Sequence, residues 1–167
     1  MKFKSLVVLE FEKIKDALKR ETITDYGAKK AASLSPFLKL SKVKGLLAEL
    51  SEAIDLYLKL GAPPINAAED ISAFVRRAEI GGTCTAAELL SIAKVLKTSE
   101  QLYSFYFKEK GIALKIERYF SLLYIDKKIQ NDITKAIISE NEISDDASVK
   151  LAGIRRRMAN SHIKIKE

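Results

Sequence analysis

The sequence has few of the residues from which common functional sites are built. It holds one cysteine (Cys84), one histidine (His162), no tryptophan and three prolines among 167 residues. A single cysteine excludes an internal disulfide, and one cysteine with one histidine is too few for a structural zinc site made from these ligands. We therefore expect no metal site. We interpret Cys84 as a small, half-buried filler and His162 as a solvent-facing side chain.

Long apolar runs are also missing. No segment approaches the roughly 20 apolar residues that a membrane-spanning helix needs. The apolar patch at the amino terminus is interrupted by Glu10 and Glu12, and no small-residue cleavage site follows, so a secretory signal is not expected. These features predict a cytoplasmic protein that does not bind a membrane.

The glycines do not form a nucleotide-binding loop. None of the seven is followed by lysine, as a phosphate-binding P-loop requires, and no G-x-G exists for a dinucleotide fingerprint. Gly81-Gly82, the strongest candidate, leads instead into Thr85 and Glu88, which have the spacing of a helix capping box. The sequence therefore predicts no catalytic residue and no bound cofactor, and a small enzyme is the least favoured hypothesis.

The residues that are abundant predict an all-α fold, an irregular bundle of several helices. Hydrophobic residues make up 47% and charged residues 31% of the chain, which suits a globular protein with a core. Apolar residues recur at helical spacing and strict alternation is rare, so no strand is expected. Helices are expected at about 5–20, 24–33, 41–60, 68–78 (capped by Asn66 and Glu69), 85–109, 112–125, 128–138 and 147–166.

Two local patterns have competing interpretations. The aromatic cluster "YSFYF" (103–107) could stack nucleic-acid bases, but its side chains must point in several directions, which favours core packing. The acidic stretch "ENEISDD" (140–146) could bind a cation, but it lacks EF-hand spacing. A solvated turn that caps the following helix is the preferred interpretation.

The net charge of +7 is concentrated at the carboxyl-terminal end. Residues 148–167 carry +5 and the first 147 residues +2. We therefore divide the chain into a helical body (1–146) and a basic helix (147–167), which has no C-cap signal and looks truncated. The candidate nucleic-acid-binding residues are Lys150, Arg155, Arg156, Arg157, Lys164 and Lys166.

The same helix has a second interpretation. Leu151, Ile154, Met158 and Ile165 fit a heptad seam, with Ser161 in place of one apolar residue. The basic residues could then be the solvated face of a coiled-coil helix instead of phosphate contacts, and the former is slightly favoured. Both alternatives stay open at the level of the sequence.

A series of short motifs resembles the MutS-II family, the bacterial MutS-like proteins that lack the mismatch-reading domains. The motifs run through the whole chain in order: "VLEF" with Lys13-Ile14; Gly61 with Pro63-Pro64; Asp70-Ile71; "RAE" (77–79) with Gly81-Gly82; "ELL" (88–90) with Ile92-Ala93; and Asp145, Ala147, Ser148, Leu151, Ile154 and Arg155. The chain departs from the family at Ala67 or Ala68, where a glycine is usual, and near Lys94, where an acidic residue is usual.

The resemblance implies a non-catalytic helical core or lever region, with the last helix starting a coiled-coil clamp arm. Family members continue into a P-loop ATPase domain and often a nuclease-like domain, so ATP and Mg are implied for a parent protein and neither for this segment. The implied partners of the parent are branched DNA or the ribosome and its RNA, in suppression of recombination or ribosome rescue, and a second copy in a homodimer. The alternative is a self-sufficient helical nucleic-acid-binding module.

Overall fold

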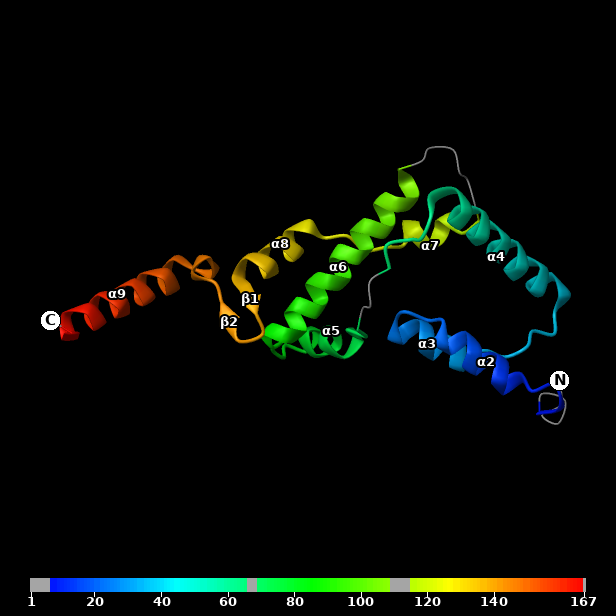
Figure 1. Cartoon of the computed structure of the whole chain (residues 1–167), viewed down its shortest axis with the longest axis horizontal. Helices are drawn as coiled ribbons and strands as arrows, with labels where there is room; N and C mark the ends of the chain where they lie inside the picture. The colour runs from blue at the N-terminus through cyan, green and yellow to red at the C-terminus, as the bar shows by residue number, and fades with distance from the viewer. Residues whose placement is uncertain (1–6, 66–68, 109–114, 167) are drawn as a thin grey trace. The chain divides into compact units, whose positions relative to one another are not determined.

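Helices make up most of the described chain, which confirms the all-α prediction (Figure 1). The computed structural model describes residues 7–65, 69–108 and 115–166; for Asp146 and residues 162–166 it describes the backbone alone. The helices are α2 (Phe11–Arg20), α3 (Asp25–Ala32), α4 (Leu40–Leu60), α5 (Ser72–Glu79), α6 (Ala86–Phe107), α7 (Glu117–Ser121), α8 (Lys127–Ala136) and α9 (Val149–Lys166), with a short 3-10 helix η1 at Asp145–Ala147.

Two expected helices are shorter than predicted. The helix after the proline pair begins at Ser72, so α5 has about two turns instead of three; its proposed cap at Asn66 lies outside the described residues. The helix expected at 112–125 is described only as α7, and residues 109–114 lie outside the description.

A small β-hairpin is present where the sequence predicts no strand. Strand β1 (Ile137–Ser139) pairs antiparallel with β2 (Glu142–Ile143), and Ile137 lies opposite Ile143. Strands of three and two residues are too short to show the alternation by which a strand is recognised. The hairpin connects α8 to η1 and so to the start of α9.

The chain folds as two compact units. Unit 1 comprises Met1–Asp70 and Thr98–Ile125, and unit 2 comprises Ile71–Lys97 and Asp126–Glu167. Helix α6 contributes residues to both. Residues on either side of the expected boundary at 146 lie in unit 2, and the division into a body and an arm stays a prediction.

The core of unit 1 is aromatic. Leu56, Tyr106 and Ile116 are buried, and Phe105 and Phe107 pack against them. Tyr106 is 2% exposed and stacks on Phe120 with ring centroids 4.4 Å apart. The prediction that the "YSFYF" cluster packs in a core is therefore confirmed for Tyr106, and Phe105 and Phe107 pack against that core.

Polar contacts connect the elements of unit 1. Ile116 N–H donates to the Glu52 carboxylate at 3.2 Å, and Arg118 Nη2 donates to Glu49 at 2.7 Å. An ion pair connects α3 to the segment before α5, where Lys29 Nζ lies 2.6 Å from the Asp70 carboxylate. This hydrogen bond and the nearby carboxylate charge raise the pKa of Lys29.

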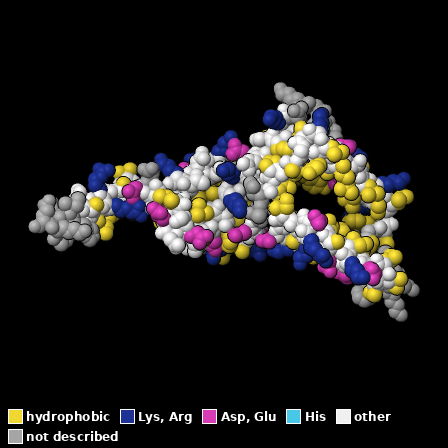
Figure 2. Space-filling view, in the orientation of Figure 1, with side chains coloured by type: hydrophobic (Ala, Val, Ile, Leu, Met, Phe, Trp, Pro, Cys, Tyr) yellow, Lys and Arg dark blue, Asp and Glu magenta, His cyan; other side chains and the backbone are white. Residues whose placement is uncertain are grey.

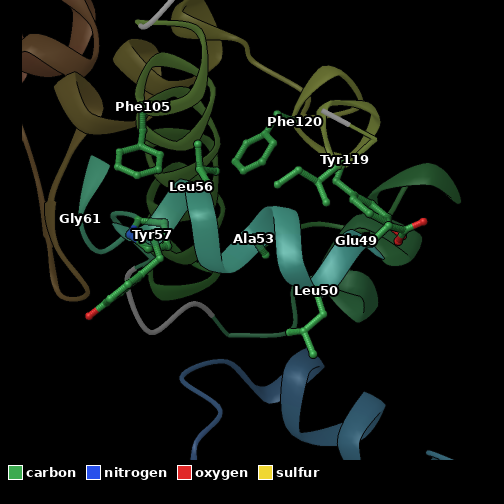
Figure 3. Close-up of a pocket in the computed structure, with 11 residues that line it drawn as sticks. Glu49, Leu50, Ala53, Leu56, Tyr57, Gly61, Phe105, Tyr119 and Phe120 are labelled. Carbon is green, nitrogen blue, oxygen red and sulfur yellow. The ribbon is translucent and has the colours of Figure 1, made fainter. Parts of the chain in front are cut away.

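An open apolar cavity of about 420 Å³ lies beside α4 in unit 1 (Figure 3). Its walls include Leu50, Ala53, Tyr57, Phe105 and Phe120. The carboxylate on its wall, Glu49, is occupied by Arg118 and by the Tyr119 hydroxyl. The cavity therefore offers apolar surface without a reactive group.

The joint between α5 and α6 organises the first part of unit 2. Gly81 adopts a positive φ of 82°, and Gly82 N–H donates to the Arg77 carbonyl at 2.9 Å, which ends α5. The predicted capping box is confirmed: Thr85 N–H donates to Glu88 at 2.8 Å and Glu88 N–H donates to the Thr85 hydroxyl at 3.3 Å. Cys84 is half-buried, as expected, with its thiol 3.8 Å from the Phe74 carbonyl.

Arg77 strengthens this joint by an ion pair with Glu88. The Thr85 backbone amide and the Arg77 guanidinium together hold the pKa of Glu88 below its usual value. Gly81-Gly82 therefore ends α5 and leads into the capped start of α6, as the sequence predicts.

Candidate nucleic-acid interface

Ser148 caps the start of helix α9. Leu151 N–H donates to the Ser148 hydroxyl at 3.1 Å, and Ala152 N–H donates to the Ser148 carbonyl. Serine is one of the preferred residues for this position because its oxygen satisfies an amide that lacks a helical partner. The acidic stretch 140–146 forms the hairpin turn, β2 and the start of η1, so its expected capping role is filled by Ser148.

The first of the three consecutive arginines is held by the chain's own fold. Arg155 Nη1 donates to the Ile143 carbonyl at 2.8 Å and pairs with the Asp145 carboxylate. These contacts fix the second turn of α9 to the end of β2 and to η1. The sequence presents Arg155 as a candidate phosphate contact and does not reveal this structural role, although an aspartate stands ten residues earlier in an acidic turn.

Other candidate residues are open to solvent. Lys150, Arg156 and Arg157 are exposed, and Figure 2 shows Lys and Arg side chains together with hydrophobic ones along α9. Because successive helical residues are rotated by about 100°, Arg155, Arg156 and Arg157 point in three different directions. Lys164 and Lys166 lie in α9, but their side chains are outside the described residues, as is that of His162.

The apolar seam of α9 becomes more exposed along the helix. Leu151 is half-buried, Ile154 is 36% exposed and Met158 is 58% exposed. Residues three and four positions apart share one face of a helix, so this face leaves apolar surface open towards Met158. Within the described residues, α9 therefore presents both a basic and an apolar surface.

The described part of the chain contains neither a metal-binding cluster nor a helix suited to a membrane. No group of three or more His, Cys, Asp or Glu residues could hold a metal ion there. Among the same residues, no helix is both long enough and apolar enough to cross a lipid bilayer.

Comparison with known proteins gives matches over the whole chain. A protein named Endonuclease MutS2 from Clostridium beijerinckii is 33% identical over 170 residues, which cover 100% of this chain. Proteins of the same name from Clostridium acetobutylicum and Clostridioides difficile are 36% and 37% identical over 100% and 99% of it. These matches support a MutS2-related family. No protein-family model matches the chain.

The chain spans 21–22% of the length of these MutS2 relatives. About four fifths of each relative's length therefore lies outside the matched region. The likeness supports the relationship that the short motifs indicated, while the assignment to the MutS-II core or lever region stays a prediction.

Proposed function

We propose that the chain is a non-catalytic helical region of a MutS2-like, DNA-associated protein, in which α9 presents cations to nucleic acid. The observation that carries this proposal is the placement of α9: Lys150, Arg156 and Arg157 are exposed, while Arg155 anchors the helix to η1 and β2. Phosphate contacts need exposed cations on a fixed element, and this helix supplies both.

In a longer parent protein, α9 would begin a clamp arm and the helical body would act as its lever. An ATPase domain elsewhere in the parent would use ATP and Mg to move the lever, and the arm would close on branched DNA or on a stalled ribosome. The name of the relatives, Endonuclease MutS2, supports a DNA target, and the exposed seam of α9 supports an arm helix. We assign no catalytic residue to this chain, and a homodimer is proposed for the parent alone.

The test is a titration of the chain against branched, duplex and single-stranded DNA and a ribosomal RNA fragment, followed by fluorescence anisotropy at several salt concentrations. Each phosphate contact contributes about 0.9 to the slope of log affinity against log salt on duplex DNA. We expect Arg156→Ala with Arg157→Ala to lower this slope by about 1.8. The matched control, Lys13→Ala with Lys44→Ala, removes two exposed cations from unit 1 and should leave it unchanged.

The same titration separates the second candidate, a self-sufficient nucleic-acid-binding module. Micromolar or tighter binding by the isolated chain supports the module, because no other domain is then required. Weak binding that still responds to the arginine substitutions supports the arm of a larger protein. No binding to any of the four probes at low salt would refute the nucleic-acid role of α9.

A further inference from the structure

We propose that the surface formed by α3, the linker after it and the start of α4 binds an unpaired strand of DNA, with its lysines on phosphates and its aromatic rings stacked on bases. This α3–α4 surface comprises residues 26–42. The inference deepens the proposed function and rests on the DNA association proposed there. It uses residues of unit 1 alone and does not require that α9 contact nucleic acid.

The charge of this part of the chain has one sign. Between Tyr26 and Ala48 the sequence has five lysines and neither aspartate nor glutamate. The five are Lys29, Lys30, Lys39, Lys42 and Lys44, and all of them are exposed. Since Lys29 is paired with Asp70, the charge offered by the α3–α4 surface is that of Lys30, Lys39 and Lys42. Such a concentration of one charge favours an anionic partner.

The neighbouring helix α2 does not reverse this charge. Glu10 and Glu12, at its start, pair with Lys13 and Lys15 at 2.7 Å and 2.9 Å. Residues 7–44, which include α2, together hold nine basic and five acidic residues. This stretch of unit 1 therefore keeps a net positive charge.

Two aromatic rings of the surface are exposed beside a lysine. Tyr26 is 63% exposed, and Lys30 Nζ lies 5.6 Å from the centre of its ring. Phe37 is 39% exposed, and Lys42 Nζ lies 4.2 Å from the centre of its ring. Tyr106, by contrast, is buried in the core and offers no ring to a partner. Single strands are bound by this combination, because a base stacks on the exposed ring while the cation meets a nearby phosphate.

The two ring–lysine pairs are close enough to meet one short strand. Helix α3 rises about 1.5 Å per residue to Ala32, and the linker from there to Phe37 extends at most about 3.4 Å per residue (Figure 1). The Cα atoms of Tyr26 and Phe37 therefore lie at most about 26 Å apart. Bases of a duplex are enclosed in the stack and cannot reach either ring, so the surface selects unpaired strands.

The experiment measures fluorescence anisotropy of labelled single strands titrated with the full 167-residue chain. One probe is oligo-dT of about 12 nucleotides, within the range that single-strand sites cover. The other is an abasic strand of equal length, which has the same phosphates and no bases. We expect oligo-dT to bind at least about fivefold more tightly, because only oligo-dT can stack on the rings.

Substitutions separate the rings from the charges. Tyr26→Leu with Phe37→Leu keeps apolar side chains and removes both rings. It should weaken oligo-dT binding at least about fivefold and leave the abasic strand and the salt slope unchanged. Lys30→Ala with Lys42→Ala should instead lower the salt slope of both single strands by about 1.4, since each phosphate contact on a single strand contributes about 0.7.

The matched charge control is Lys13→Ala with Lys44→Ala. Lys44 follows Lys42 by two residues and so points about 200° away from it around α4. This control removes the same charge as the lysine pair and should leave the single-strand slope unchanged. All substituted side chains are exposed, so the urea midpoint of each variant should match that of the unchanged chain.

Equal binding of oligo-dT and the abasic strand would overturn the inference, because phosphates alone would then be recognised. Unchanged oligo-dT affinity after loss of both rings would do the same. Polyglutamate that binds as tightly as oligo-dT would indicate an acidic protein as the partner, and tighter binding of oligouridine would refute the assignment to DNA. If Arg156→Ala with Arg157→Ala leaves the duplex slope unchanged while the ring-dependent preference persists, the proposed role of α9 fails and this inference stands.

Discussion

The close fit of Gly82 against the end of α5 gives the sharpest prediction about stability. A Cβ atom at Gly82 would lie 2.5 Å from Arg77 Cγ and 2.9 Å from the Arg77 carbonyl oxygen, whereas carbon atoms in contact normally lie about 3.5–4.0 Å apart. The Arg77 side chain could shift, but its carbonyl accepts the Gly82 N–H at 2.9 Å and is held in the last turn of the helix. We therefore expect Gly82→Ala to lower the free energy of unfolding by about 1–3 kcal/mol.

Two other glycines provide controls of opposite sign. Gly45 in α4 and Gly153 in α9 have nothing within 4 Å of an added Cβ atom. Alanine is favoured over glycine in a helix interior, so each Gly→Ala substitution should raise the free energy of unfolding by about 0.5–1 kcal/mol. Urea denaturation followed by far-ultraviolet circular dichroism measures all three variants.

A second substitution identifies which atom causes the cost at Gly82. Arg77→Ala removes Cγ but retains the carbonyl oxygen, so most of the destabilisation by Gly82→Ala should persist in the Arg77→Ala background. If Gly82→Ala were as stable as the unchanged chain, the close contact with Arg77 would not determine the choice of glycine, and the reasoning would be refuted.

Three further predictions concern ionisation, the proline pair and the core. The pKa of Glu88 is lowered in the fold, so the ionised carboxylate stabilises the fold above the ordinary pKa of about 4.3, and this stabilisation is lost as pH falls through the lowered value. The urea midpoints at neutral and acidic pH should therefore differ less for Glu88→Gln than for the unchanged chain. Pro63→Ala with Pro64→Ala should lower the melting temperature, through about 1–2 kcal/mol of added unfolded-state entropy, without changing nucleic-acid affinity. Tyr106→Ala should cost about 3–5 kcal/mol in urea denaturation, whereas Tyr26→Ala, at a site 63% exposed, should cost less than about 1 kcal/mol.

Interactions within one helical turn were predictable from the sequence. Interactions between side chains of different elements were not. The Thr85–Glu88 box was recognised because both partners lie within one helical turn. The anchoring of Arg155 was not recognised because Asp145 lies ten residues earlier in η1, and the two side chains meet only where the chain turns from η1 into α9. The sequence therefore identified α9 as the candidate element but overestimated how many of its cations are available.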